Sequence, residues 1–391
     1  MKKCEVCGYD NLESVLNMGN HPLCDDLVPI GNDRICIEYP IHILYCNKCY
    51  TAFQAKEVPK RTLFTESYHY RARMTGSVLT GMQDLVQSTV ERLGDISGKF
   101  VLDIGCNDGS LLNFFEEKGC KTLGIEPTGA ALESSHETLN TFFDFESASL
   151  VKEKYGSPDI ITFTNVFAHI ENLPELLDNL AILIGKNTNI VIENHYLGDI
   201  LKRDQFDTFY HEHPRTYSLR SFEFIAKSLG LSLLDAQFVS RYGGNIRVFL
   251  GKGVSNSAPK YDESVFLNEF IEMRKNIETW KNTTKAWISD YVKENGKIRA
   301  KAFPGRAAIM IKLLDLNDEY ISAVYEIKGS IKVGHYVPGT RIPILPEVEL
   351  YALDNQDLPI LNLAWHIPNE VCANLVSNGY TGKVVHIKNF D

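Results

Sequence analysis

The sequence lacks any apolar run long enough to cross a membrane, and it is short of positive charge. A spanning helix needs about 20 apolar residues, so we expect no membrane segment. Lysine and arginine total 40 against 50 aspartates and glutamates, a formal net charge of -10, which disfavours nucleic acid and anionic membranes as partners. The opening residues, MKKCEVCGYDN, carry no apolar stretch. We therefore expect no signal peptide and a cytoplasmic location.

Internal repeats and low-complexity tracts are also missing from the chain. Its 391 residues are 44% hydrophobic and 23% charged, which is ordinary globular composition and predicts two or three domains. The nine cysteines are an odd number in a chain with no evident secretion signal. This pattern is typical of reduced thiols rather than of a disulfide framework.

Four of the cysteines form two C-x-x-C pairs, Cys4 with Cys7 and Cys46 with Cys49. Four thiolates suit a tetrahedral Zn²⁺ ion and leave no open position for catalysis, so the pattern predicts a structural zinc site. A redox C-x-x-C is the weaker alternative, because it needs one pair only and no strand–helix context follows. The others are expected to be small buried residues: Cys24, Cys36, Cys106, Cys120 and Cys372.

The middle of the chain begins with helical spacing of apolar residues over 77–94, followed by KFVLDIGCNDGSLLNFFEEKG at 99–119. The latter predicts a buried strand, a glycine turn and a helix. Such a turn brings the backbone N–H groups of Gly105 and Gly109 and a helix N-terminus towards a ligand. The next strand, KTLGIEP, ends at Glu126, which can accept hydrogen bonds from both hydroxyls of a ribose.

Strands and helices alternate onwards to residue 229, including a short strand expected at 141–145. This alternation predicts a parallel sheet covered on both faces. Two further strands are joined only by the turn RYGG at 241–244, so they should be antiparallel. A terminal hairpin of this kind separates a class I methyltransferase from a dehydrogenase-like Rossmann domain.

The glycine turn also differs from a dinucleotide site, because it lacks the middle glycine of G-x-G-x-x-G. S-adenosylmethionine has no phosphate and needs acceptors for its ammonium group. Asp103, Asn107 and Asp108 supply such acceptors. An NAD-binding fold with a degenerate loop is the alternative.

The string YHEHPRTYS at 210–218 gathers Tyr210, His211, Glu212 and His213. If it is a loop beyond the fifth strand, it lies at the carboxyl edge of the sheet, where ligands bind in open α/β folds. Histidine titrates near neutral pH and is a credible base. The alternative is a metal site, but side chains two residues apart on an extended chain point to opposite sides. We favour acid–base chemistry over a metal site, and the role of His211, either in this chemistry or in holding the loop, stays open.

Taken in order, these motifs resemble a known family. The paired C-x-x-C motifs, VLDIGCNDGSLL, GIEP, NVFAHI, FYHEHPRTYS, GHYVPGTRIPI and LNLAWHI are similar to segments of the zinc-containing sugar C-methyltransferases of deoxysugar pathways. The resemblance implies an α/β enzyme with three domains: a zinc-binding domain at 1–75, a class I methyltransferase (Rossmann-like) domain at 76–254 and a second Rossmann-like, substrate-binding domain at 255–391. It also implies that S-adenosylmethionine methylates a nucleotide-linked 4-keto-deoxysugar beside its ketone, usually at C3.

The resemblance also implies which residues form the site. Tyr210, Glu212 and His213 are expected to line it, with Tyr70 and His169 contributing. We take His213 as the base that generates an enolate, assisted by Glu212 and Tyr210. The expected cofactor-binding residues are Asp103, Gly105, Asn107, Asp108, Gly109, Glu126, Pro127, Asn165 and Val166. A departure follows Tyr70, where Arg71-Ala72-Arg73 replaces the serines usual in the family.

Two questions stay open at this point. In the C-terminal third, Arg306, His335, Tyr336 and Arg341 are candidates for phosphate or sugar contacts, and ordinary loop chemistry with salt bridges is the alternative. The activity could also be O-methylation, which needs only a base near a hydroxyl, or the chain could be a zinc-stabilised scaffold without methyl transfer.

Overall fold

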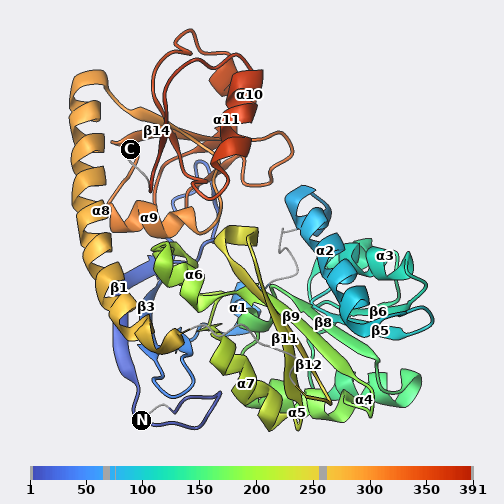
Figure 1. Ribbon diagram of the computed structural model, residues 1–391. Helices are drawn as coiled ribbons and strands as arrows, with labels where there is room; N and C mark the ends of the chain where they lie inside the picture. Colours follow the sequence, from blue (N-terminus) through green and yellow to red (C-terminus); the bar gives the residue numbers. More distant parts are fainter. Residues whose placement is uncertain (1–2, 65–70, 75, 255–261, 389–391) are drawn as a thin grey trace. The chain divides into compact units, whose positions relative to one another are not determined.

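The computed structural model describes residues 3–64, 71–74, 76–254 and 262–388 (Figure 1). The chain divides into two compact units, each built from three separate stretches. The first unit comprises residues 1–15, 43–203 and 212–268, and the second comprises residues 16–42, 204–211 and 269–391. Among the described helices, none combines the length and apolarity that a membrane span requires.

A seven-stranded sheet forms the centre of the first unit, in the order β11-β12-β9-β8-β5-β6-β7 (Figure 1). Its strands are β5 (Phe100–Ile104), β6 (Lys121–Ile125), β7 (Thr138–Leu139), β8 (Ile160–Thr164), β9 (Asn189–His195), β11 (Ser232–Val239) and β12 (Asn245–Gly251). The first five are parallel, and β12 pairs antiparallel with both β9 and β11. The parallel sheet and its terminal hairpin are therefore confirmed.

Helices cover this sheet. They are α2 (Gly76–Leu93), α3 (Ser110–Glu116), α4 (Phe145–Tyr155), α5 (Leu173–Leu183), α6 (Leu197–Lys202) and α7 (Leu219–Ser228). Short 3-10 turns of the first unit are η1 (Ala72–Met74), η2 (Gly129–Glu133), η3 (Phe167–His169), η5 (Arg241–Gly243) and η6 (Glu263–Val265), whereas η4 (Phe206–Thr208) belongs to the second unit. Apolar residues of α2 and α3 pack with β5, β8, β9 and β12 in one buried cluster, which the helical spacing over 77–94 predicted.

The prediction of a strand at 141–145 is wrong. Residues 141–145 do not form a strand, and the edge strand β7 lies just before them. The Asp144 side chain accepts a hydrogen bond from the backbone N–H of Ser147, and the Ser147 hydroxyl accepts one from the N–H of Asp144. This capping box starts α4 at Phe145. The local cap outweighed the aromatic residues that suggested a strand.

A second, four-stranded sheet has the order β1-β3-β4-β10. Its strands are β1 (Glu13–Pro22), β3 (Glu38–Tyr45), β4 (Ala52–Gln54) and β10 (Arg215–Thr216), and the one-turn helix α1 (Lys60–Leu63) follows β4. The boundary between the two units falls within β1 and β3. Strand β10 pairs antiparallel with β4, with Arg215 opposite Phe53. The residues that follow the YHEH string thus complete the sheet of the N-terminal segment.

The second unit contains a five-stranded parallel sheet in the order β16-β14-β13-β17-β18. These strands are β13 (Ile298–Lys301), β14 (Ile321–Glu326), β16 (Ile344–Pro346), β17 (Ile360–Asn362) and β18 (Val384–His386). The helices are α8 (Phe266–Asn295), α9 (Ala307–Leu313), α10 (Glu347–Tyr351) and α11 (Pro368–Ser377), and β2 (Val28–Pro29) pairs with β15 (His335–Tyr336). The second Rossmann-like pattern is confirmed.

Candidate active site and zinc site

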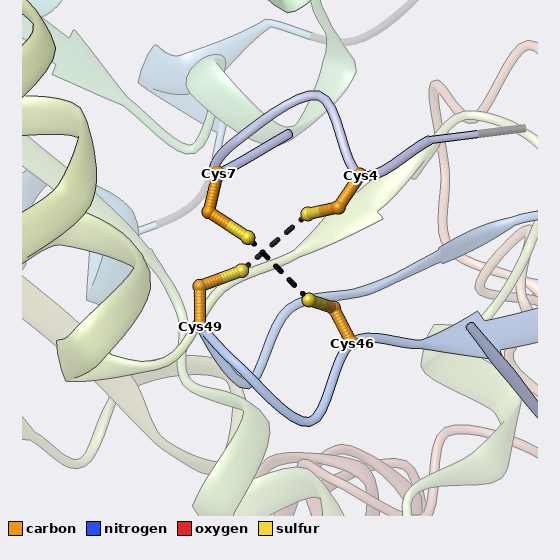
Figure 2. Close-up of side chains that lie close together, drawn as sticks. All are labelled: Cys4, Cys7, Cys46 and Cys49. Atoms are coloured by element: carbon orange, nitrogen blue, oxygen red, sulfur yellow. Dashed lines mark hydrogen bonds between the residues drawn. The ribbon is translucent and has the colours of Figure 1, made fainter. Parts of the chain in front are cut away.

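The four paired cysteines meet at one point in the first unit (Figure 2). All four sulfurs lie within 4.8 Å of one another, with Cys4 Sγ 3.4 Å from Cys49 Sγ and Cys7 Sγ 3.5 Å from Cys46 Sγ. Tetrahedral zinc with Zn–S bonds of about 2.3 Å separates its sulfurs by roughly 3.8 Å, so the set fits this ion closely. Each pair can therefore supply two of the four ligands.

Both cysteine pairs sit in tight turns. The N–H of Gly8 donates to the carbonyl of Cys4, and the N–H of Tyr50 donates to that of Cys46, each at 2.8 Å. Gly8 and Tyr50 have φ angles of 73° and 59°, so both turns close through the left-handed region.

The remaining cysteines mostly match the expectation that they are small buried residues. Cys24, Cys36, Cys106 and Cys120 are buried, whereas Cys372 on α11 is partly exposed. The difference at Cys372 follows from the single buried face of α11, which Val371 and Leu375 occupy.

The glycine turn after β5 has the backbone that its sequence predicts. Gly105, Asn107 and Gly109 all have positive φ angles, between 52° and 77°. A Cβ on Gly105 would lie 2.6 Å from both Cγ atoms of Val166, so only glycine fits there. Val166 follows β8, the strand beside β5. The turn and the segment after β8 therefore meet closely at the carboxyl edge of the sheet.

All three acidic residues of the expected cofactor site, Asp103, Asp108 and Glu126, are buried. The Thr162 hydroxyl donates to Asp103 Oδ1 at 2.6 Å, and burial raises the pKa of Asp103 to about 7. Glu126 Oε2 accepts from the N–H of Asn107 at 3.1 Å. Its Oε1 accepts from the N–H and hydroxyl of Thr128, at 2.9 and 2.6 Å. A carboxylate offers about four acceptor positions, so Glu126 is oriented and still has capacity for a ribose hydroxyl.

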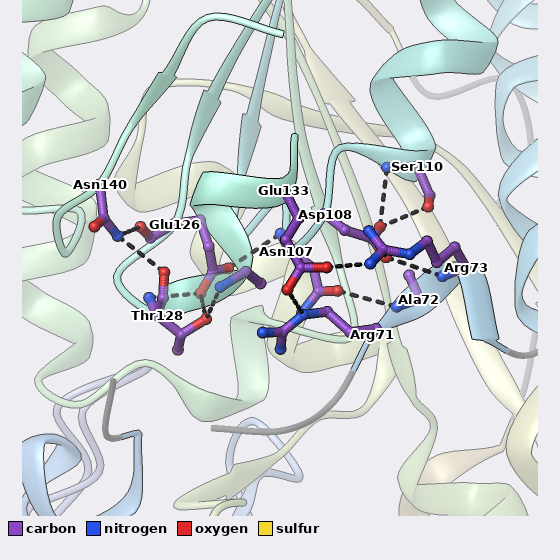
Figure 3. Close-up of polar contacts among 11 residues, drawn as sticks. Arg71, Ala72, Arg73, Asn107, Asp108, Ser110, Glu126, Thr128, Glu133 and Asn140 are labelled. Carbon is purple, nitrogen blue, oxygen red and sulfur yellow. Dashed lines mark hydrogen bonds and ion pairs between the residues drawn. The ribbon is translucent and has the colours of Figure 1, made fainter. Parts of the chain in front are cut away.

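The segment after Tyr70 lies over the glycine turn (Figure 3). The N–H of Ala72 donates to Asn107 Oδ1 at 3.0 Å, and the N–H of Arg73 donates to Asp108 Oδ2 at 3.1 Å. Glu133 on η2 forms ion pairs with Arg71 and Arg73. The two side chains expected to bind the cofactor therefore also hold residues 71–74, and Glu133 was missed by the sequence analysis.

Three histidines cluster beyond the carboxyl edge of the same sheet. His169 ends η3 after β8, His195 ends β9, and His213 follows in the YHEH string. The His213 ring centroid lies 4.7 Å from that of His169 and 5.2 Å from that of His195. The structure thus brings together His169 and His213, which were expected in the site, and places His195 beside them.

The His169 ring is held by a backbone carbonyl. Its Nδ1 lies 2.7 Å from the carbonyl oxygen of Glu212, so Nδ1–H donates. Burial lowers the pKa of His169 to about 4, so the ring is neutral at pH 7. A neutral imidazole beside His213 avoids like-charge repulsion when that ring takes up a proton.

The YHEH string is divided between the two units. Glu212 and His213 belong to the first unit, whereas Tyr210 and His211 belong to the second. There, His211 Nε2 contacts the carbonyl of Tyr39 on β3 at 3.0 Å, and its ring lies edge-on to the Tyr39 ring. This contact ties the string to Tyr39. Tyr70 lies outside the described residues.

The chain leading into the string is anchored in the second unit. Asp207 on η4 is fully buried, and its Oδ2 lies 2.9 Å from both Arg306 Nε and Trp365 Nε1. The Arg306 guanidinium lies over the Trp365 ring, 5.1 Å from its centroid. Arg306 is thus engaged with the segment that carries Tyr210.

The other C-terminal candidates contact the N-terminal part of the second unit. Arg341 donates to the carbonyls of Asn32 and Asp33, at 2.7 and 2.9 Å. The Tyr336 hydroxyl accepts from the N–H of Gly31 at 3.2 Å, and His335 pairs with Pro29 across β15 and β2. These contacts match the loop-chemistry alternative.

Two further expected cofactor residues lie at the edge of the sheet. Asn165 has a φ angle of 54°, its N–H donates to the carbonyl of Glu193 at 2.7 Å, and its Oδ1 accepts from Asn245 at 3.0 Å. Pro127 is half-buried behind Glu126. With the glycine turn and three buried carboxyl groups, this edge suits S-adenosylmethionine, which presents an ammonium group and ribose hydroxyls.

Comparisons with known proteins cover almost the whole chain. Residues 4–64 match the family model described as "Putative zinc binding domain", residues 78–236 match "Methyltransferase domain", and residues 242–386 match "C-methyltransferase C-terminal domain". The C-methyltransferase NovU of Streptomyces niveus is 26% identical, over 95% of this chain and 91% of the relative.

Solved structures similar to part of the chain include two bacterial methyltransferases. Magnesium protoporphyrin IX methyltransferase of Synechocystis PCC 6803 is 16% identical, with a TM-score of 0.35, and the match covers 44% of this chain and 84% of that one. The 1,6-didemethyltoxoflavin-N1-methyltransferase of Burkholderia thailandensis is 15% identical, with a TM-score of 0.38, and the match covers 52% and 96%.

The family matches follow the order of the elements in the structure. A zinc-binding segment precedes a class I methyltransferase domain, and a C-methyltransferase C-terminal domain follows it. The four cysteines fit zinc, and the edge of the central sheet fits S-adenosylmethionine. The chain is therefore an S-adenosylmethionine-dependent methyltransferase whose segments are similar, in this order, to the three family models.

Proposed function

We propose that this enzyme methylates carbon in a nucleotide-linked 4-keto-deoxysugar, at the position beside the ketone and most simply at C3. The observation that carries the proposal is the cluster of His169, His195 and His213 beyond the carboxyl edge of the cofactor-binding sheet. Carbon methylation needs a base to remove a proton from carbon. An imidazole, which titrates near neutral pH, supplies such a base.

His213 is the proposed base. It takes a proton from the carbon beside the ketone, and the C–H electrons form the enolate. The cofactor, when bound, supplies an electrophilic methyl group. The enolate carbon would accept this methyl group, and the electron pair of the methyl–sulfur bond would stay on the cofactor's sulfur. Tyr210 is proposed to donate to the enolate oxygen, and Glu212 to orient an imidazole or bind a sugar hydroxyl.

The resemblance to sugar C-methyltransferases and the similarity to NovU support the choice of substrate. The domain bounds of 1–75, 76–254 and 255–391 are part of this proposal, and the order of the matched segments at 4–64, 78–236 and 242–386 supports them. Tyr70 is proposed to complete the site, because residues 71–74 that follow it lie over the cofactor turn.

Deuterium exchange separates carbon methylation from oxygen methylation. Wild-type enzyme with S-adenosylhomocysteine and a 4-keto-sugar nucleotide in deuterium oxide should exchange the proton beside the ketone, and His213→Asn should slow exchange and methyl transfer by about 10²–10⁴-fold. His386→Asn, a histidine of the second unit, is the control and should keep both rates. Oxygen-bound label without proton exchange in the wild type would instead establish O-methylation.

A further inference from the structure

Arg215 links the zinc turn to the histidine cluster. Its side chain is 2% exposed, on strand β10 two residues after His213. Nε donates to Glu5 Oε2 at 2.6 Å, and Nη2 contacts the same oxygen. Nη1 donates to the carbonyl of Ile170 at 2.7 Å, and a second carboxylate, that of Glu57, lies 3.7 Å from Nη2.

These contacts connect two sites that are far apart in the sequence. Glu5 lies between Cys4 and Cys7, inside the first cysteine turn. Ile170 follows His169 directly. One guanidinium group therefore contacts the zinc turn and the backbone beside His169, while its own backbone continues from His213.

The second cysteine turn is tied to the same stretch of chain. The hydroxyls of Ser218 and Ser221 donate to the carbonyl of Cys49, at 3.0 and 3.2 Å. Arg220 Nε donates to the carbonyl of Lys48 at 2.8 Å. The start of α7 is thus fixed on the second turn, and Arg215 is fixed on the first.

Arginine suits this role because of its geometry. The guanidinium group is planar and directs its N–H donors in a fixed fork, so several partners determine its position together. A buried charge is tolerated only when it is paired, so Arg215 cannot leave Glu5 without a large cost. A small displacement of Glu5 should therefore displace the backbone at both histidines.

We propose that Arg215 is a positioning residue, through which the Glu5 side chain of the zinc turn sets the separation of His169 and His213. Zinc then supports catalysis without touching the substrate, because it holds the turn that carries Glu5. The catalytic consequence rests on the proposed function, in which His213 is the base. The geometric part concerns the two imidazoles alone and is measured without substrate.

The test compares two acids that each touch a cysteine turn. Glu5→Gln keeps the side-chain size and removes the charge of the closer of the two carboxylates beside Arg215. Glu13→Gln is the matched control, because Glu13 accepts a hydrogen bond from Asn47 of the second turn but does not contact Arg215. Both variants should retain the zinc content of the wild type, measured by metal analysis.

The kinetic result expected is a fall in kcat of about 10- to 100-fold for Glu5→Gln, since misplacement of about 1 Å has this effect. Its KM for S-adenosylmethionine should stay within about twofold of the wild-type value, because the contacts of Glu5 described above do not involve the expected cofactor-binding residues. Glu13→Gln should keep kcat within about twofold of the wild type. Equal kcat losses in the two variants, or none in Glu5→Gln, would overturn the proposal.

A measurement without substrate separates this proposal from the proposed function. In protein with ¹³C-labelled imidazoles, the His169 and His213 signals should shift in Glu5→Gln and in Arg215→Lys, and stay in place in Glu13→Gln. Unchanged signals in zinc-loaded Glu5→Gln overturn the positioning role, even if Arg215→Lys does not fold. Shifted signals in an enzyme that methylates no keto-sugar overturn the proposed substrate and retain the positioning role.

Discussion

The zinc site and the histidine cluster are built in opposite ways. Each cysteine turn places two ligands three residues apart and closes with its own backbone hydrogen bond. The histidines come from η3, the end of β9 and the loop beyond it, and their spacing depends on contacts between distant segments. The zinc ligands are thus fixed locally, whereas the proposed catalytic residues are fixed only by the folded unit. Changes outside the cysteine turns should therefore affect catalysis before they affect metal binding.

The largest expected effect comes from Cys49→Ser, which removes one of the four zinc ligands. Structural zinc contributes on the order of 10 kcal/mol in small zinc domains, so zinc content should fall close to zero and the free energy of unfolding should drop by several kcal/mol. Metal analysis and chemical denaturation measure the two effects. Cys372→Ser is the control, because Cys372 lies outside the cluster. Full zinc retention by Cys49→Ser would contradict the assignment.

Asp207→Asn should have the next largest effect, a loss of folding stability and of methyl-transfer rate. Asp207 lies in the segment that leads into the YHEH string. The substitution leaves Arg306 buried without its anionic partner, which typically costs about 3 kcal/mol of folding free energy. The Trp365 hydrogen bond can persist, because asparagine keeps an acceptor oxygen. Because Asp207 lies three residues before Tyr210, we also expect the methyl-transfer rate to fall by about tenfold.

The control for that change is Glu347→Gln, which breaks the Lys301–Glu347 ion pair in the same unit. Chemical denaturation should show comparable losses of stability in the two variants. Methyl transfer should slow in Asp207→Asn alone. If both variants slow methyl transfer to the same extent, the effect belongs to general stability and not to the anchor at Asp207.

A smaller and pH-dependent effect is expected at Asp103. Its folded pKa is about 7, above the ordinary value of 3.8, so the folded state retains a proton that the unfolded state releases. Stability contributed by this proton is present below pH 4 and is lost as the pH rises to about 7, by up to about 4 kcal/mol. When the free energy of unfolding of cofactor-free Asp103→Asn is measured by denaturation between pH 4 and 8, it should not show this decrease. An identical pH dependence in the two proteins would show that Asp103 titrates normally.

The smallest expected effect concerns the segment over the glycine turn. Glu133→Gln removes the partner of Arg71 and Arg73, and these ion pairs are exposed, so the fold should keep its stability. We expect the Kd for S-adenosylmethionine, measured by calorimetry, to rise about threefold because residues 71–74 are held less firmly. Glu137→Gln breaks another exposed pair, with Lys154, and should leave the Kd unchanged. A Kd that responds equally to both changes would argue against a role for the segment.

The same contrast explains what the sequence could predict. Paired cysteines, a glycine turn and alternating strands and helices are local patterns, and the structure confirms the cysteine cluster, the turn and both parallel sheets. His169 could be placed at the sheet edge because it follows a strand. The failure at 141–145 was also local, since the capping residue Asp144 was overlooked.

The features that were missed depend on tertiary structure. His195 ends a strand at the correct edge, so the position of β9 could have indicated it. Glu5 and Arg215 are 210 residues apart, and nothing in their local sequence pairs them. The division of the YHEH string between two units likewise has no local signal.

The two-residue strand β10 has a practical consequence for dissecting the enzyme. Its residues follow His213, yet they pair with β4 and not with the central sheet. A fragment restricted to the matched methyltransferase domain, residues 78–236, would contain β10 without its partner strand and Arg215 without Glu5. Such a fragment can keep the cofactor-binding edge and still lose the arrangement of its histidines. We therefore expect the smallest piece able to carry out methyl transfer to include the cysteine turns, so zinc binding and catalysis should be gained or lost together when the protein is shortened from its N-terminal side.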